Sequence, residues 1–163
     1  MANRFATLVR IVTFDLILSV NALTVGGLTA ATKARYFRTM QHSPGFLKLV
    51  DEARAHVKEI SIDQARERLA KNPQAVLLDV REDNEWAKEH AVQAVRLGKG
   101  ILERDLESRF LDPNHEIIMY CGGGYRSVLT AEAAQKMGYR NVYSLKGGYK
   151  GLVQAGWPMT SGK

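Results

Sequence analysis

The sequence predicts an α/β domain with a small parallel β-sheet and helices on both of its faces. From residue 43 onward, short apolar runs that indicate buried strands alternate with segments of helical periodicity, and this alternation is typical of parallel sheets. The chain has 163 residues, which suits one compact domain with an appendage. Its single cysteine and four scattered histidines lack the paired spacing of a zinc site, so we expect a reducing compartment and no bound metal.

Residues 1–39 form an apolar, basic leader that differs in character from the rest of the chain. Its apolar stretch is interrupted by an arginine, an aspartate and an asparagine, so the uninterrupted part is short for a membrane span. The leader could be a signal peptide, a membrane anchor or organelle transit segment, or an extension upstream of a natural start at Met40. We favour the last interpretation, which places the domain at 40–163 in the cytoplasm. A membrane-anchored or exported protein is the alternative.

The net charge of +6 does not indicate nucleic-acid binding once it is divided by region. The leader holds five basic side chains and one acid, so it contributes +4 of the total. The remaining 124 residues carry only +2 and contain no basic run or interleaved aromatic stripe. We therefore expect no nucleic-acid partner, and a membrane partner only if residues 1–39 act as an anchor.

The domain is expected to open with a helix over 43–57. Ser43 can cap this helix with Pro44 at its first position, and apolar residues then recur at helical spacing. A short extended segment is predicted at 59–62. Ser61 and Gln64 then make a capping box for the next helix.

The later elements follow from apolar runs and capping residues in the same way. Asp83 is expected to cap a short helix, and Gly138 to close a longer one. Strands are predicted at 75–80, 94–98, 116–121 and 141–146, and helices at 61–69, 83–90, 101–111, 127–138 and 147–157.

The loop CGGGYRS, residues 121–127, carries the strongest sign of function. Cys121 ends the most apolar predicted strand, and ligands bind at that edge of open parallel sheets. Successive glycines can turn their N–H groups toward one point, which forms an anion-binding nest before a helix N-terminus. Such a nest stabilises a thiolate, the reactive form of cysteine, and Arg126 can bind an anion through two N–H groups. A lone buried cysteine is often only a small apolar residue, but three glycines and an arginine beside it favour a binding loop.

Three motifs together resemble the single-domain rhodaneses, or thiosulfate sulfurtransferases. CGGGYRS is similar to their Cys-x-x-Gly-x-Arg-Ser active loop. LLDVREDNEW (77–86) is similar to their Asp-Val-Arg-x-x-x-Glu-Trp signature, and LKGGYKGLVQAGWPM (145–159) to their C-terminal motif. The resemblance covers residues 43–160. One departure is EHAVQAV (89–95), where the family usually has Gly-His-Ile-Pro-Gly-Ala.

The resemblance implies a rhodanese-like fold and a two-step sulfur transfer without metal or organic cofactor. Cys121 thiolate would take the outer sulfur of thiosulfate or of a persulfide donor, and the resulting persulfide would pass it to a thiol or cyanide. Arg126 is the second catalytic candidate. The substrate-binding candidates are Gly122, Gly123, Gly124, Tyr125, Ser127 and Arg81.

The roles of two of these candidates, and the overall function, have alternatives. Arg81 could lend positive potential to the site or form a structural ion pair with a neighbour, and Tyr125 could stack on substrate or fill the outer side of the loop. The chain could also be a sulfur relay fed by a protein persulfide partner, or a non-catalytic interaction domain. A cysteine phosphatase or arsenate reductase is more distant, because four residues separate Cys121 from Arg126 where phosphatase loops have five.

Overall fold

The computed structural model describes residues 42–162. The predicted leader and the proposed start at Met40 lie outside this range. Residues from Pro44 onward form one compact unit. Within the described range, no helix combines the length and the apolar character that crossing a membrane requires.

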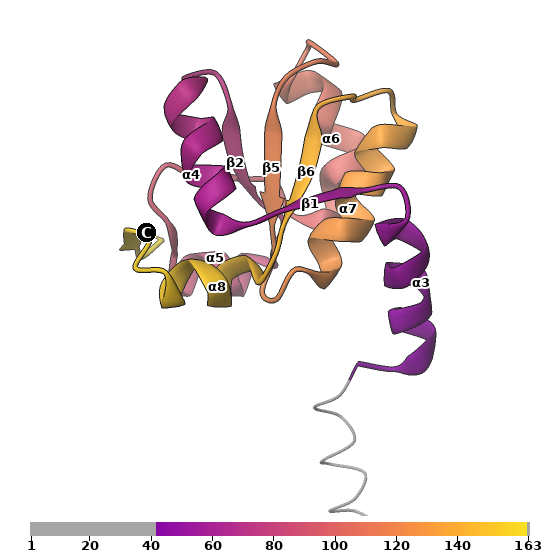
Figure 1. Ribbon diagram of the computed structural model, residues 1–163, viewed down its shortest axis with the longest axis horizontal. Helices are drawn as coiled ribbons and strands as arrows, with labels where there is room; N and C mark the ends of the chain where they lie inside the picture. Colours follow the sequence, from indigo (N-terminus) through magenta and orange to yellow (C-terminus); the bar gives the residue numbers. More distant parts are fainter. Residues whose placement is uncertain (1–41, 163) are drawn as a thin grey trace, which may run out of the picture. The chain divides into compact units, whose positions relative to one another are not determined.

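A five-stranded parallel sheet forms the centre of this unit (Figure 1). The strand order is β1-β6-β5-β2-β4, and all four neighbouring pairs run parallel. The central strand, β5, is buried along its whole length, as expected of a strand covered on both faces. The strands are β1 (Lys58–Ile60), β2 (Val76–Asp79), β4 (Val95–Arg96), β5 (Ile117–Tyr120) and β6 (Val142–Leu145).

Helices cover both faces of the sheet, which confirms the predicted fold class. One apolar cluster joins the sheet to α3 (Pro44–Arg54), α6 (Leu102–Arg109) and α7 (Tyr125–Lys136). A second cluster on the other face joins it to α4 (Ile62–Lys71) and α8 (Gly148–Gln154). Helix α5 (Asp83–Lys88) lies with α8 at the carboxyl ends of the strands, in the lower part of Figure 1.

The first half of the unit agrees with most of the local signals in the sequence. Ser61 and Gln64 form the predicted capping box, with N···O distances of 2.9 and 3.2 Å. The first helix ends at Arg54 rather than at residue 57, because the chain turns there to enter β1.

The predicted cap of α5 was wrong by one residue. Asp83 is already helical, and Glu82 is the N-cap. The carboxylate of Glu85 accepts a hydrogen bond from the N–H of Glu82 at 3.4 Å, which satisfies one of the free donors at the start of the helix. The same helix ends at Lys88, so His90 lies in a strand and not in the helix.

A second, two-stranded sheet was not predicted. It pairs β3 (His90–Ala91) with β7 (Met159–Thr160) in antiparallel orientation. Each strand has only two residues, which is too short to show a periodic pattern in the sequence. The pairing joins the segment near the carboxyl terminus to the segment that follows α5.

Candidate active site

Cys121 directly follows the central strand β5, at the carboxyl edge of the sheet. It is a free cysteine with 1% of its surface exposed. Its two neighbouring strands, β2 and β6, end at the same edge because the sheet is parallel. The sulfur therefore lies at the place where open α/β sheets bind ligands.

Gly124 connects the cysteine to helix α7. It has a φ of +93° and is the N-cap of the helix, a conformation that a residue with a β-carbon rarely adopts. Its N–H donates a hydrogen bond to Cys121 Sγ at 3.2 Å. The helix begins one residue later, so its positive end and a backbone donor both face the sulfur, which stabilises negative charge on it.

Two backbone N–H groups of helix α8 donate hydrogen bonds to the first half of the loop. The N–H of Tyr149 donates to the carbonyl of Cys121 at 2.6 Å, and the N–H of Lys150 donates to the carbonyl of Gly122 at 3.2 Å. In a trans peptide the carbonyl and the next N–H point in opposite directions. The N–H groups of Gly122 and Gly123 therefore point away from α8, so the loop has a defined set of free donors.

Arg126 lies in the first turn of α7 and is paired with a carboxylate from α5. Its Nη1 and Nη2 contact the two oxygens of Glu85 at 2.6 and 3.0 Å, and Nη1 lies 3.5 Å from Glu82. The hydrogen bonds with Arg126 hold the pKa of the Glu85 carboxyl below its usual value. The same pair raises the pKa of Arg126, with a smaller contribution from the negative charge of Cys121. The guanidinium thus stays charged beside the loop, with both of these nitrogens on a carboxylate.

Three further loop candidates are half-buried. Gly122 and Gly123 are half-buried, and Tyr125 is half-buried at the start of α7. The Tyr125 ring packs near Phe46 of α3, with ring centroids 6.3 Å apart, and the guanidinium of Arg54 lies 5.2 Å from its centre. Tyr125 thus joins the loop to the first helix, while its role toward a substrate stays a prediction.

Ser127 is fully buried one residue after Arg126. Its hydroxyl lies 2.9 Å from the hydroxyl of Ser144 on β6. This hydrogen bond fixes α7 to the sheet directly behind the loop. The predicted contact of Ser127 with substrate stays a prediction. The buried pair does not favour it, because it engages the one polar atom of the side chain.

Arg81 forms the structural ion pair that the sequence analysis gave as an alternative to a role in the site. It is 3% exposed, and its guanidinium contacts Asp79 at 2.6 to 3.0 Å and the carbonyl of Glu89 at 2.7 Å. The rings of Tyr149 and Tyr120 lie 4.4 and 5.6 Å from its guanidinium carbon. The guanidinium therefore makes its contacts inside the domain, with residues of β2, β5 and α8. A direct contact between Arg81 and substrate stays a prediction that this burial does not favour.

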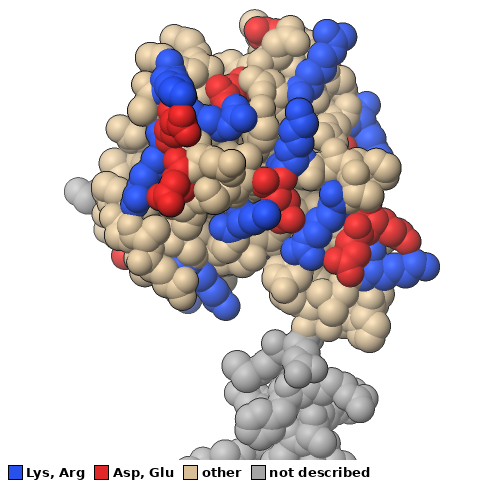
Figure 2. Space-filling model, in the orientation of Figure 1, with Lys and Arg blue, Asp and Glu red and all other residues tan. Residues whose placement is uncertain are grey.

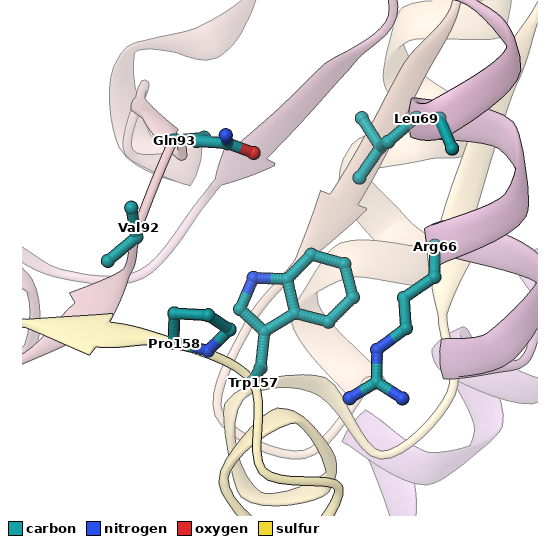
Figure 3. Close-up of a pocket in the computed structure, with 7 residues that line it drawn as sticks. Arg66, Leu69, Val92, Gln93, Trp157 and Pro158 are labelled. Carbon is teal, nitrogen blue, oxygen red and sulfur yellow. The ribbon is translucent and has the colours of Figure 1, made fainter.

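On the face shown in Figure 2, basic and acidic side chains are interspersed. A separate hollow of about 410 Å³ lies over α4 and the segments that bear β3 and β7. Figure 3 shows the indole of Trp157 between Arg66 and Pro158 in this hollow. None of the residues that line it belongs to the Cys121 loop.

Sequence reasoning assigned no role to two residues that shape the site. Glu85 holds Arg126, and it is the acid of the LLDVREDNEW motif, so its position in that motif was the available signal. Gly148 lies against the carbonyl of Cys121, and the paired glycines of LKGGYK were the signal there. Both residues are near Cys121 in space but far from it in the chain.

Residues 61–155 match the family model described as Rhodanese-like domain. The chain is 35% identical over 101 residues to the thiosulfate sulfurtransferase GlpE of Actinobacillus pleuropneumoniae serotype 7, a match that covers 62% of this chain and 91% of the relative.

Solved structures that share the fold include two from bacteria. The polysulfide-sulfur transferase homodimer of Wolinella succinogenes is 26% identical with a TM-score of 0.61, and the match covers 72% of this chain and 88% of that one. A protein of unknown function from Rhodopseudomonas palustris, described as a possible tyrosine phosphatase, is 24% identical with a TM-score of 0.65. That match covers 74% of this chain and 97% of the other, and it shows the fold alone.

Proposed function

The chain belongs to the rhodanese-like domain family, and from that premise we propose that it is a sulfurtransferase that carries sulfane sulfur on Cys121. The donor is thiosulfate or a persulfide, and the acceptor is a thiol or cyanide. The similarity to relatives named sulfurtransferases supports the general activity. The geometry around Cys121 supports the assignment of the sulfur carrier.

In the first step, Cys121 thiolate attacks the outer sulfur of thiosulfate. A bond forms between the two sulfurs, the original S–S bond breaks, and its electron pair leaves with sulfite. One thiolate and one dianion give one persulfide anion and one sulfite dianion, so charge and electrons balance without an oxidant. This is nucleophilic catalysis through a covalent intermediate.

In the second step, the acceptor attacks the outer sulfur of the persulfide. Cyanide leaves as thiocyanate, or a thiolate leaves as its own persulfide, and Cys121 returns as a thiolate. The intermediate has its negative charge on the outer sulfur, which would lie over the glycine loop. The loop N–H groups and the positive end of α7 stabilise that charge, as donors stabilise an oxyanion in other enzymes.

One observation carries the proposal, which is the hydrogen bond from Gly124 N–H to Cys121 Sγ at 3.2 Å. A cysteine that served only as a small apolar residue would not need a backbone donor and a helix start directed at its sulfur. Arg126 adds a fixed positive charge to the same helix turn. We assign it the role of keeping the loop positive while the sulfur is transferred.

The test is the intact mass of the full chain after incubation with thiosulfate, followed by cyanide, for the wild type and for Cys121→Ser. We expect the wild type alone to gain about 32 Da, one sulfur atom, and to lose it as thiocyanate appears. Loading without continued turnover would indicate a relay fed by a protein partner. A gain on Cys121→Ser, or no gain on either protein, would contradict Cys121 as a carrier loaded by thiosulfate.

A further inference from the structure

The ion pair between Glu85 and Arg126 lies directly against the glycine loop. A β-carbon placed on Gly122 would lie 3.2 Å from Arg126 Nη2 and 3.6 Å from Glu85 Oε1. Both side chains are about a third exposed, at 28% and 33% for Arg126 and Glu85. A donor that approaches the loop from this side therefore meets the carboxylate of Glu85 together with the guanidinium.

The charges beside the loop do not favour a dianion. Arg126 is the cation that contacts Glu85 and Glu82, and Arg81, whose charge also acts on Glu85, is already paired with Asp79. Glu85, Glu82 and the Cys121 thiolate are the anions of this group. Two lysines, Lys146 and Lys150, flank the segment that supports the loop, but both are exposed. Water and salt screen exposed charges strongly and half-buried ones less. Glu82 is 63% exposed and is screened as the lysines are, whereas the half-buried carboxylate of Glu85 cancels the charge of Arg126 beside the loop.

Both oxygens of Glu85 also accept hydrogen bonds from the two terminal nitrogens of Arg126. The two contacts, at 2.6 and 3.0 Å, have the parallel two-pronged geometry in which arginine binds carboxylates most strongly. A sulfonate group could take the two N–H groups that face Glu85 only by displacing its carboxylate. The displaced carboxylate would then remain beside a donor of the same charge.

We propose that Glu85 sets the charge selectivity of this site, disfavouring dianionic donors such as thiosulfate relative to sulfane-sulfur donors of lower negative charge. The natural donor class is then a persulfide of a neutral or zwitterionic thiol. This inference rests on the proposed function of Cys121. It assigns to Glu85 the choice of donor, which the family resemblance alone does not specify.

The transfer step balances for such a donor. Cys121 thiolate attacks the outer sulfur of R–S–SH, and a bond forms between the two sulfurs. The S–S bond of the donor breaks, and its electron pair leaves with R–S⁻. One anion enters and one anion leaves, and the proton stays on the transferred sulfur. No oxidant or reductant is needed.

Three donors with the same reacting atoms test the proposal. Thiosulfate carries two negative charges, methanethiosulfonate carries one, and 2-aminoethanethiosulfonate is a zwitterion with no net charge. Each would transfer its outer sulfur to Cys121 and release sulfite or the corresponding sulfinate. The rate of mass gain on the full chain gives one loading rate constant for each donor.

The variant is Glu85→Gln, which keeps the shape and an oxygen acceptor for Arg126 but removes the charge. Glu67→Gln is the matched control, because Glu67 is an exposed glutamate paired with Lys71 on α4. A unit charge about 4 Å away changes a rate about fivefold even at the dielectric of water. We therefore expect Glu85→Gln to speed loading about 25-fold for thiosulfate and about fivefold for methanethiosulfonate, with little change for the zwitterion.

The outcomes separate this inference from the function on which it rests. The proposal is supported if the loading rate constant rises in Glu85→Gln by a factor that grows with donor charge, and does not rise in Glu67→Gln. An equal rise or an equal fall of the rate constant for all three donors overturns the proposal, because a merely structural Glu85 would affect every donor alike. Cys121 would then still be a sulfur carrier. If no donor adds sulfur to the wild type, both the proposed function and this inference are wrong.

Discussion

Gly148 approaches the carbonyl of Cys121 so closely that a β-carbon on Gly148 would lie 2.2 Å from the carbonyl oxygen. The next residue, Tyr149, donates its N–H to that same oxygen at 2.6 Å. The first turn of α8 can therefore support the cysteine loop only if it begins with a residue that has no side chain. The position of the proposed nucleophile depends on a glycine 27 residues further along the chain.

Gly148→Ala should destabilise the domain and slow persulfide loading on Cys121. The backbone φ of +51° alone costs an alanine about 1 kcal/mol, and the contact with the carbonyl adds to this. Gly156→Ala is the control, because Gly156 has a φ of +64° but nothing within 4 Å of its β-carbon position. Urea unfolding and the loading rate should separate the two variants. Equal destabilisation with normal loading in both would show that the close approach does not matter.

Asp79→Asn should be strongly destabilising, because it leaves the guanidinium of Arg81 buried without its counter-charge. Asp79 and Arg81 are 0% and 3% exposed, and breaking a buried pair of this kind costs about 3–5 kcal/mol. Asp105→Asn removes an acid from a pair with Arg104, whose side chain is 72% exposed and stays solvated without its partner, and we expect little change. The free energies of unfolding in urea measure both. A small loss in Asp79→Asn would mean that Arg81 can reach solvent or another partner.

Ser127→Ala should cost about 1–3 kcal/mol of unfolding free energy, because it leaves the buried hydroxyl of Ser144 without its partner. Adding Ser144→Ala should cost less than the sum of the two single changes, since the double variant has no unpaired hydroxyl. A double-mutant cycle in urea measures this coupling. Strict additivity would indicate that the 2.9 Å contact contributes nothing to stability.

The carboxyl of Glu85 should titrate below its usual pKa of 4.5, because its hydrogen bonds with Arg126 favour the ionised form. A lowered folded-state pKa stabilises the fold at pH values above the unfolded pKa, and this contribution is lost as the pH falls through the folded-state value. The window therefore lies below pH 4.5. Carboxyl NMR titration of Glu85 in the wild type and in Arg126→Gln measures it. The pKa should rise in the variant, and an unchanged value would mean that Arg126 does not hold the carboxylate.

Long apolar runs made the central part of the fold predictable. The segment ending in Cys121 indicated a buried strand, and β5 is the buried central strand of the sheet. The Ser61 and Gln64 capping box was also predictable, because both partners lie within one helical turn. The pairing of β3 with β7 was not, because two-residue strands about 70 residues apart leave no local pattern.

The sequence by itself determined the parallel α/β fold, the position of Cys121 at the end of a buried strand, and the glycine loop that opens a helix. These features depend on residues that are adjacent in the chain, so apolar periodicity and backbone preferences express them directly. Only the tertiary structure decided that Glu85 holds Arg126, that the side chain of Arg81 is buried inside the domain, and that Gly148 supports the loop. Which partner a charged side chain meets depends on how the elements pack, and sequence spacing alone does not specify that.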